Sequence, residues 1–430
     1  RLQNDYQLSK AIKVGYTATG SLSKSNDIYS GLMNMIFNAA PIVPVRYADG
    51  AYGDPADYSL GNSVANPQVT VDFFNQKAKI YRVTGSAYAD IKIAKHFTLH
   101  SSLGGEYSQS EVKAFVPTYQ GTATQNNSVS ILTMYKAENR NWILENTLTY
   151  ENQFGDHRIK ALIGQTAQQY RNYGLTGSIK GVPNADDAGL YFSLGTPGSA
   201  NVTDYGDLST TASYFGRINY SFKNRYLLTL SMRGDGSSKF IGNQRWGYFP
   251  SIGAGWVITD EPFMKDQKIF NTLKLRGSWG KIGNASVPTN TATQLIDQGG
   301  ARVAFFGMPS VAYAGASDNQ IVPPVLYWER GEGTDIGLEA AVLRNHLSIE
   351  ADFYNKKTQQ AIFNAPVLNS LGLATSSIIA NQADFQNRGF ELALTWKDNI
   401  GKDWSYSISG NIGINDNKIL SVVTGNNPIY

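Results

Sequence analysis

The sequence predicts an all-β protein, namely a transmembrane antiparallel β-barrel. Between Asn224 and Asn284, apolar and polar side chains alternate with period two through three successive segments. Strands with one face in lipid and the other in water show this alternation. The apolar faces begin or end in Trp and Tyr, which transmembrane barrels place at the lipid headgroups. Short polar turns also alternate with much longer connections, as periplasmic turns and outer loops do in such barrels.

Composition favours the same class. Charged residues make up 17% of the 430 residues, below the roughly 25% usual for soluble domains. The formal net charge is only +3 and the basic residues form no run, so we predict no nucleic-acid partner. No apolar run approaches the roughly 18 residues of a membrane-spanning helix. Because Cys is absent, disulfides and thiolate metal sites are excluded.

Reading the chain for period two gives about 13 strands. The first is expected near residues 6 to 19, and the later strands form pairs joined by short turns. Leu228 and Leu275 fall on apolar faces, and we predict that they meet lipid near the midplane, where Arg or Lys would cost roughly 2 to 4 kcal/mol. The predicted short turns are Ala94-Lys95, Phe154-Gly155-Asp156, Lys223-Asn224, Leu343-Arg344-Asn345-His346 and Gly401-Lys402-Asp403.

An odd strand count predicts an incomplete barrel. Bacterial single-chain barrels use even strand numbers, and an open edge in lipid leaves unpaired backbone groups that each cost several kcal/mol. The sequence begins at Arg1 without an initiator Met or an apolar leader. We therefore expect the native protein to be longer than this chain.

The chain is interpreted as a single partial barrel domain, 1–430, with long extracellular loops. These loops are rich in Asn, Ser, Gly and Pro, and loops of such length usually carry function. In the first loop, Ile28, Leu32, Met35 and Ile36 recur at helical spacing before Pro41, which predicts a short helix. The predicted loops lie near residues 20–57, 108–140, 173–210, 281–332 and 357–386.

Catalytic and metal sites are not predicted. His96 and His100 are four residues apart, but their segment alternates as a strand and no Glu follows His96 as a zinc protease motif requires. No G-x-S-x-G elbow or Walker-type Gly-Lys-Ser/Thr occurs. Nothing fixes two carboxylates at the separation that glycoside hydrolysis needs. We therefore predict no enzyme, no metal and no cofactor. The carboxylates expected on the inward face are Glu145, Glu350, Asp352 and Glu391.

The segment Arg233-Gly234-Asp235-Gly236 contains an adhesion tripeptide and the beginning of a calcium-loop pattern. A calcium loop needs several oxygen ligands at alternating positions, and only one carboxylate is present. Asp-Gly supplies the positive φ that tight turns need. We therefore interpret Asp235-Gly236 as a turn between two strands.

The best candidates for substrate contact are aromatic residues in long, otherwise polar loops. Aromatic faces stack on sugar rings or on peptide side chains and bury a large area. The alternative left open is that they anchor loops to one another or meet the headgroups. The candidate residues are Phe115, Tyr119, Phe305, Phe306, Tyr313, Tyr327 and Trp328.

Many short segments, each weak alone, follow one another through most of residues 30 to 415. They include PIVPV (41–45), NRYLLT (224–229), RGDGSSKF (233–240), RWGYFPS (245–251), KLRGSWG (274–280), TDIGLE (334–339), DFYNKKT (352–358) and NRGFEL (387–392). Together, and in this order, these segments resemble the SusC/RagA family of TonB-dependent outer-membrane transporters.

This resemblance implies a barrel of about 22 strands with a plugged lumen, of which this chain is the middle part. The family's plug domain, its TonB-contacting segment and its final strands have no counterpart here. The implied function is import of oligosaccharides or peptides across the outer membrane of a Gram-negative bacterium. The implied partners are a SusD-like surface lipoprotein, outer-membrane lipid, and the TonB complex acting through the missing N-terminal region.

Two other classes share some of these features. A passive outer-membrane porin would show the same alternation, but no plug sequence would precede it. An outer-membrane barrel enzyme would need a nucleophile, a base and an orienting residue near the rim.

Overall fold

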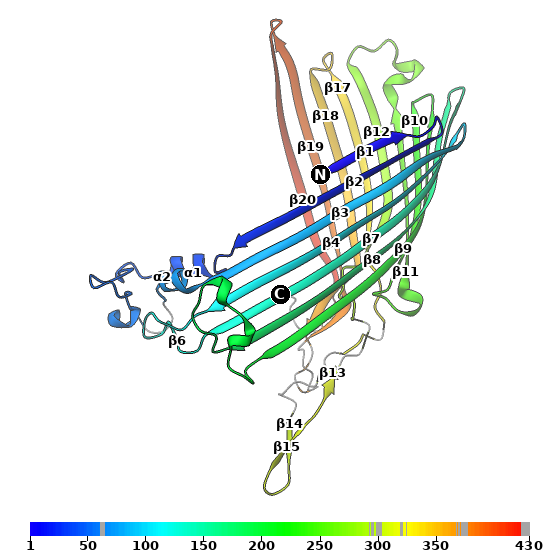
Figure 1. Cartoon of the computed structure of the whole chain (residues 1–430). Helices are drawn as coiled ribbons and strands as arrows, with labels where there is room; N and C mark the ends of the chain where they lie inside the picture. The colour runs from blue at the N-terminus through cyan, green and yellow to red at the C-terminus, as the bar shows by residue number, and fades with distance from the viewer. Residues whose placement is uncertain are drawn as a thin grey trace.

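The chain forms one large antiparallel sheet, which Figure 1 shows as a curved and strongly twisted wall. The structure is a computed structural model that describes residues 1–60, 65–291, 293, 296–297, 303–318, 321–323, 325–366, 368, 370 and 377–422. In it, 14 strands pair in the order β1-β2-β3-β4-β7-β8-β9-β10-β11-β12-β17-β18-β19-β20. Nearly every strand pairs with its neighbour in the chain, which is the up-and-down topology of transmembrane barrels. The predicted fold class is confirmed.

The strands of this sheet are long and are broken by few irregularities. They are β1 (Leu2–Gln7), β2 (Ile12–Asn26), β3 (Asn75–Ala94), β4 (Phe97–Val116), β7 (Ile131–Phe154), β8 (His157–Lys180), β9 (Asn201–Phe222), β10 (Tyr226–Ser237), β11 (Trp246–Val257), β12 (Phe270–Asn284), β17 (Glu329–Val342), β18 (Leu347–Pro366), β19 (Ser377–Ile400) and β20 (Trp404–Val422).

The connections contain short elements of their own. The helices are α1 (Leu32–Asn38) and α2 (Pro67–Phe73), and the 3₁₀ turns are η1 (Pro55–Tyr58), η3 (Asp187–Gly189), η4 (Phe192–Leu194), η5 (Gly242–Arg245), η6 (Ile258–Asp260) and η7 (Pro262–Met264). The short strand pairs are β5 (Tyr119–Gln120) with β6 (Asn126–Asn127), β13 (Ile296–Asp297) with β16 (Ser317–Asp318), and β14 (Val303–Phe306) with β15 (Val311–Ala314). The helix predicted from residues 28 to 36 is present as α1.

The predicted count of about 13 strands is too low by one, because the expected first strand is a hairpin. Leu2–Gln7 pairs antiparallel with Ile12–Asn26, with Leu2 opposite Ala18. The turn is closed by a hydrogen bond from Leu8 N to Ile12 O of 2.9 Å. Polar residues dominate β1, so its strand pattern is weak in the sequence. Among the described residues, β1 pairs only with β2 and β20 only with β19, so the sheet has two open edges.

All five predicted short turns are present, and they lie at one end of the sheet (Figure 1). The Lys223-Asn224 turn has φ of 54° and 52°, the left-handed pair that suits a two-residue hairpin. Gly401 and Gly155 also adopt positive φ, 69° and 57°, which costs a residue without a Cβ little.

The long connections gather at the opposite end, where Figure 1 shows α1, α2 and the β13–β15 region. The strands extend further toward this end than the sequence indicates. For example, β4 reaches Val116 and β7 begins at Ile131, so the connection between them is 117–130, where the sequence placed a loop near 108–140. Among the described residues, no helix is long and apolar enough to cross a membrane.

Cross-strand pairing sorts the side chains into two faces. Leu230 lies opposite Ile218 on β9 and Ile252 on β11. Its neighbour Ser231 lies opposite Ser251, and the two hydroxyl oxygens are 2.6 Å apart. Since directly paired residues share a face, one face of the wall is apolar and suits lipid, and the other is polar and suits a lumen.

The structure corrects the prediction of a turn at Asp235-Gly236. Both residues lie inside β10, where Asp235 pairs with Ser213 and Gly247. The strand continues because the Asp235 carboxylate receives two bonds from Arg233 Nε, at 2.7 and 2.9 Å, and therefore does not cap a turn. The chain reverses later, over residues 238–245, where Gly242 has φ of 59°.

The short-turn end is fastened by one buried carboxylate, Glu261. Its side chain accepts hydrogen bonds from Arg225 Nη1 at 2.8 Å, from Trp256 Nε1 at 3.0 Å and from the Tyr226 hydroxyl. The Tyr226 hydrogen bond is the largest of the effects that hold the pKa of Glu261 below its ordinary value, and burial opposes them. Glu261 thereby ties the η6–η7 connection to the ends of β10 and β11.

Candidate functional site

The polar face carries a network of charges centred on Arg276 of β12. Its guanidinium contacts Asp335 at 2.9 Å, Glu339 at 3.0 Å and Asp352 at 2.6 Å, and Lys274 also reaches Glu339 at 3.1 Å. These side chains come from β12, β17 and β18, which are consecutive in the sheet. Charge-assisted pairs of this kind fix side-chain positions on a wall that faces water.

The four carboxylates expected on the inward face all lie on this polar face. Asp352 pairs directly with Glu391, and Glu350 is two residues along the same strand. Glu145 lies between Ser102 and Thr166. His100 contacts Asp90 at 2.7 Å, and the described residues contain no group of three or more potential metal ligands.

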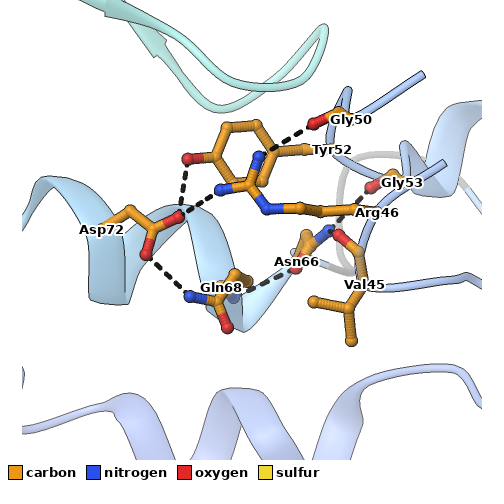
Figure 2. Close-up of polar contacts among 8 residues, drawn as sticks. All are labelled: Val45, Arg46, Gly50, Tyr52, Gly53, Asn66, Gln68 and Asp72. Carbon is orange, nitrogen blue, oxygen red and sulfur yellow. Dashed lines mark hydrogen bonds and ion pairs between the residues drawn. The ribbon is translucent and has the colours of Figure 1, made fainter. Parts of the chain in front are cut away.

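The outer end holds a compact unit built from the first long connection, shown in Figure 2. Arg46 donates to Asp72 at 2.6 Å and to the Gly50 carbonyl at 2.9 Å, and its guanidinium lies 4.0 Å from the centre of the Tyr52 ring. Tyr52 and Gln68 each donate to the same carboxylate at 2.7 Å. The Asp72 carboxylate therefore joins α2 to the 46–52 hairpin.

Burial would raise the pKa of Asp72, but hydrogen bonds from Tyr52, Gln68 and Arg46 outweigh it and hold this pKa below its ordinary value. The carboxylate is therefore ionised at neutral pH. Asn66 adds a second clamp, because its amide nitrogen donates to the carbonyls of Val45 and Gly53, both at 3.0 Å (Figure 2).

This unit is attached to the next outer connection as well. Gln125 accepts from Asn66 N at 2.6 Å and donates back to Asn66 O at 3.1 Å. Tyr119 stacks on Phe73 of α2 with ring centres 4.2 Å apart. The first two outer connections therefore form one fastened body above the ends of β2, β3 and β4.

An apolar cavity of about 320 Å³ lies within this body, between α1 and the start of α2. Leu32 and Ile36 of α1 and Val71 of α2 line it, with Val43 and Pro55 from the intervening segments. A cavity of this size suits one apolar side chain or a small ring.

Two clusters of buried side chains support the remaining outer connections. Phe115 is 4% exposed and packs with Leu132, Ile179, Val182 and Leu190. The second cluster holds Trp328, which is 8% exposed. Its ring lies 4.9 Å from Phe240 and 5.6 Å from Phe249. Its Nε1 donates to the Gln244 carbonyl at 3.0 Å.

The seven candidate contact residues therefore fall into different environments. Phe115 and Trp328 are buried by protein, which is the loop-anchoring alternative left open by the sequence. Tyr119 is half-buried against Phe73. Tyr327, Phe305, Phe306 and Tyr313 are 43%, 67%, 62% and 55% exposed. The structure does not bring the seven together, and substrate contact by any of them stays a prediction.

Sequence reasoning missed the Arg46–Asp72 clamp. A local signal was present, because Asp54-Pro55 and Asn66-Pro67 each place a capping residue before Pro at the first helical position. Asp54 and Asn66 do cap η1 and α2, accepting from Ala56 N at 2.9 Å and from Gln68 N at 3.0 Å. The pairing of Arg46 with a residue 26 positions away carries no such signal.

Comparison with known proteins decides the family. The family model described as "TonB dependent receptor-like, beta-barrel" matches residues 16–429. The chain belongs to this family. The barrel is accordingly an outer-membrane protein of a Gram-negative bacterium, as the predicted localisation states.

Curated relatives agree with this assignment. TonB-dependent receptor P26 of Formosa agariphila is 27% identical over 97% of this chain and 41% of its own length. TonB-dependent receptor SusC of Bacteroides thetaiotaomicron is 29% identical over 86% of this chain and 36% of its own length. The chain thus spans about two fifths of the length of these relatives.

Solved structures support the fold. The structure of the RagAB peptide transporter superposes with a TM-score of 0.81 at 20% identity, covering 98% of this chain and 46% of that one. The siderophore receptor PiuA from Acinetobacter baumannii gives a TM-score of 0.51 at 13% identity, covering 98% of this chain and 56% of that one. The chain is therefore similar to SusC in sequence and shares the fold of the RagAB barrel.

Proposed function

We propose that this barrel takes part in TonB-dependent import of an oligosaccharide or a peptide across the outer membrane. The observation that carries the proposal is the family match over residues 16–429, together with a sheet whose two faces separate lipid from a charged lumen. The sequence resemblance implies oligosaccharides or peptides, and one similar solved structure is described as a peptide transporter. Both substrate classes therefore remain within the proposal.

Substrate capture is assigned to the outer end. The fastened unit around Arg46 and Asp72 presents a preformed surface, and it contains the apolar cavity between α1 and α2. A preformed surface loses little conformational freedom on binding. Tyr119 and Tyr327 keep part of their rings accessible at this end and are the proposed contacts for sugar rings or peptide side chains.

Passage is assigned to the polar face. The cluster around Arg276 has three carboxylates and two cations, all fixed to the wall by pairing. Such a wall stays hydrated and offers hydrogen-bonding partners to a polar solute. The partners in the proposal are a SusD-like surface lipoprotein at the outer end and the TonB complex, acting through a plug domain of the longer protein.

The dependence of uptake on TonB separates this proposal from a passive porin. Uptake of labelled oligosaccharides and oligopeptides would be measured in cells that carry the full-length natural protein, with and without a functional TonB. Loss of uptake without TonB is expected. Uptake that continues unchanged without TonB would instead establish passive diffusion, and turnover of a substrate by the purified protein would establish an enzyme.

A further inference from the structure

Five lysines gather on one face of the wall, near the outer ends of β2, β3, β4 and β7. Two rows of directly paired positions carry them. In the second row, Lys77 of β3 lies opposite Lys113 of β4, one pair further toward the outer end than the first row. The first row crosses the four strands in the order Lys24, Lys79, Glu111 and Lys136.

Strand pairing places both rows on the apolar face. Three direct pairs connect Phe97 of β4 to Ile218 of β9, and Ile218 pairs with Leu230 of the apolar face. Side chains separated by an even number of residues share a face of a strand. Glu111 and Lys113 are separated from Phe97 in this way, so the lysines lie on the outside of the barrel and not on the face that suits a lumen.

The depth of the rows corresponds to the lipid headgroups. Phe97 and Tyr107 are ten residues apart on this face, which at about 3.4 Å per residue and a tilt of about 40° is roughly 26 Å along the membrane normal, close to the apolar band of about 25 Å. Tyr81 lies one pair further out. By the same arithmetic, Lys79 and Lys77 lie roughly 5 and 10 Å beyond Tyr81. The headgroup layer extends roughly 5 to 8 Å beyond the hydrocarbon, and flexible lysine stems bring their charges to it.

Three of these lysines line one side of a pocket of about 390 Å³. Its other side is the connection between β8 and β9, in which Leu190 is only 2% exposed in the buried cluster described above. A Cβ on Gly177 of β8 would lie 2.8 Å from the ring of Phe192, so this glycine permits the connection to lie close against the wall. The Lys113 ammonium is 5.9 Å from the centre of the Tyr191 ring. The pocket is therefore preformed by packing.

The charges of the two rows do not balance. The rows hold five lysines and one carboxylate, a surplus of four positive charges. Glu111 contacts Lys136 at 3.4 Å. Like charges at directly paired positions destabilise a sheet, and here Lys24 lies opposite Lys79 and Lys77 opposite Lys113. An anion bound between the lysines would offset this repulsion.

The position of the pocket selects the kind of anion. A solute passing through the lumen reaches the opposite face of the wall, whereas a lipid of the outer leaflet lies directly beside the two rows. Basic groups at headgroup level attract anionic lipids, and lysine binds phosphate as a point charge. Met134 and Phe192 give the pocket an apolar part as well, which suits an amphiphile better than an inorganic ion.

We propose that this pocket binds a phosphate group of an anionic glycolipid in the outer leaflet of the outer membrane. The ammonium groups of Lys77, Lys79 and Lys113 hold the phosphate, and the Tyr191 ring lies beside the sugar that carries it. The site is outside the barrel, so it is separate from the proposed substrate pathway and fixes the height of the barrel in the membrane.

The test is a titration of the full-length natural protein in detergent with bisphosphorylated lipid A and with the same lipid after removal of both phosphates. We expect the phosphorylated lipid to bind at least tenfold more tightly than the dephosphorylated lipid. K77Q/K79Q should weaken its binding at least tenfold, and K77R/K79R should retain it. The matched control is K265Q/K268Q, which removes two charges from exposed lysines at the opposite end of the barrel. Heat-resistant mobility on gels verifies folding of each variant.

A second variant separates binding from a structural role of the lysines. E111Q removes the one carboxylate of the two rows, so we expect it to tighten binding of the phosphorylated lipid about threefold.

Four results would overturn the inference. They are equal affinity for the two lipids, equal loss in K265Q/K268Q, unchanged affinity in K77Q/K79Q, and weaker binding in E111Q. Full displacement of the lipid by millimolar inorganic phosphate would assign the pocket to a soluble anion instead, and displacement by a purified surface lipoprotein would assign it to a protein partner. None of these readouts involves uptake, so failure of this inference is distinguished from failure of the transport function.

Discussion

Replacement of Leu230 by Arg tests which face of the wall meets lipid. Leu230 lies in β10, four residues from Tyr226, which pairs with Trp256, and four residues from Gly234, which pairs with Tyr248. Eight residues at about 3.4 Å each span roughly 27 Å along the strand. At a tilt of about 40° this corresponds to roughly 21 Å along the membrane normal, close to the apolar band of about 25 Å. Leu230 is therefore at the midplane.

The expected cost of L230R is roughly 2 to 4 kcal/mol, the range for Arg at the midplane of a barrel. The structure revises the expectation for Leu275, because it pairs with Trp256 in the aromatic row. There the same substitution costs only about 0 to 1 kcal/mol. The predicted position of Leu275 near the midplane is thus wrong. Leu228 is two residues from Tyr226, so the expected cost of L228R lies between the costs of L275R and L230R.

The assay is the free energy of unfolding of the full-length barrel in lipid vesicles, followed by tryptophan fluorescence during titration with guanidinium chloride. L275R is the matched control, since it makes the same change on the same face. Equal costs for the two variants, or a larger cost for L275R, would refute the assignment of faces and depth.

Three further predictions concern the fastenings described above. E261Q should lower the melting temperature at pH 7. Because the pKa of Glu261 is depressed in the folded protein, the difference in melting temperature between E261Q and the unsubstituted protein should shrink as the pH falls below about 4.5, the ordinary pKa of a glutamate. A difference that does not change with pH would count against an ionised carboxylate at this position. D72N should speed amide hydrogen exchange in residues 65–74, whereas D49N, in the exposed turn of the same connection, should not; equal exchange in both would show that the Arg46–Asp72 clamp is dispensable. W328A should lower the free energy of unfolding by roughly 3 to 5 kcal/mol, as truncation of a buried Trp does. The control Y327A truncates the half-exposed neighbouring residue and should cost less than about 1 kcal/mol. Similar losses in the two variants would contradict the burial of Trp328.

Local patterns predicted most of the wall. The Lys223-Asn224 turn and the alternating faces of β10 depend on residues adjacent in sequence, where period two and turn chemistry operate. β1 was missed because its residues are mostly polar, so only its pairing with β2 reveals it. The prediction of a turn at Asp235-Gly236 was wrong because the Arg233 side chain and the two partner strands, and not the dipeptide itself, decide the backbone conformation there.

The outer end was less predictable, because aromatic residues of similar local context have opposite environments. Trp328 is buried by Phe240 and Phe249, which are 88 and 79 positions away in sequence. Phe306 remains exposed because, within the part of the chain that the structure describes, β14 and β15 pair only with each other. Tertiary packing alone separates these two residues, so composition of a loop identifies candidates for contact without ranking them.

The two faces of the wall also explain why its register must be exact to one residue. Arg276 lies on the polar face among three carboxylates, while its neighbour Leu275 meets the aromatic row in lipid. A slip of β12 by one residue would exchange these faces and place an unpaired guanidinium in the membrane. The tight turn at Lys223-Asn224 and the Glu261 hub hold β9, β10 and β11 in line at one end, and the Arg276 pairs hold β12, β17 and β18 across the polar face. The charge network that hydrates the proposed pathway therefore also selects the register that keeps its own charges out of lipid.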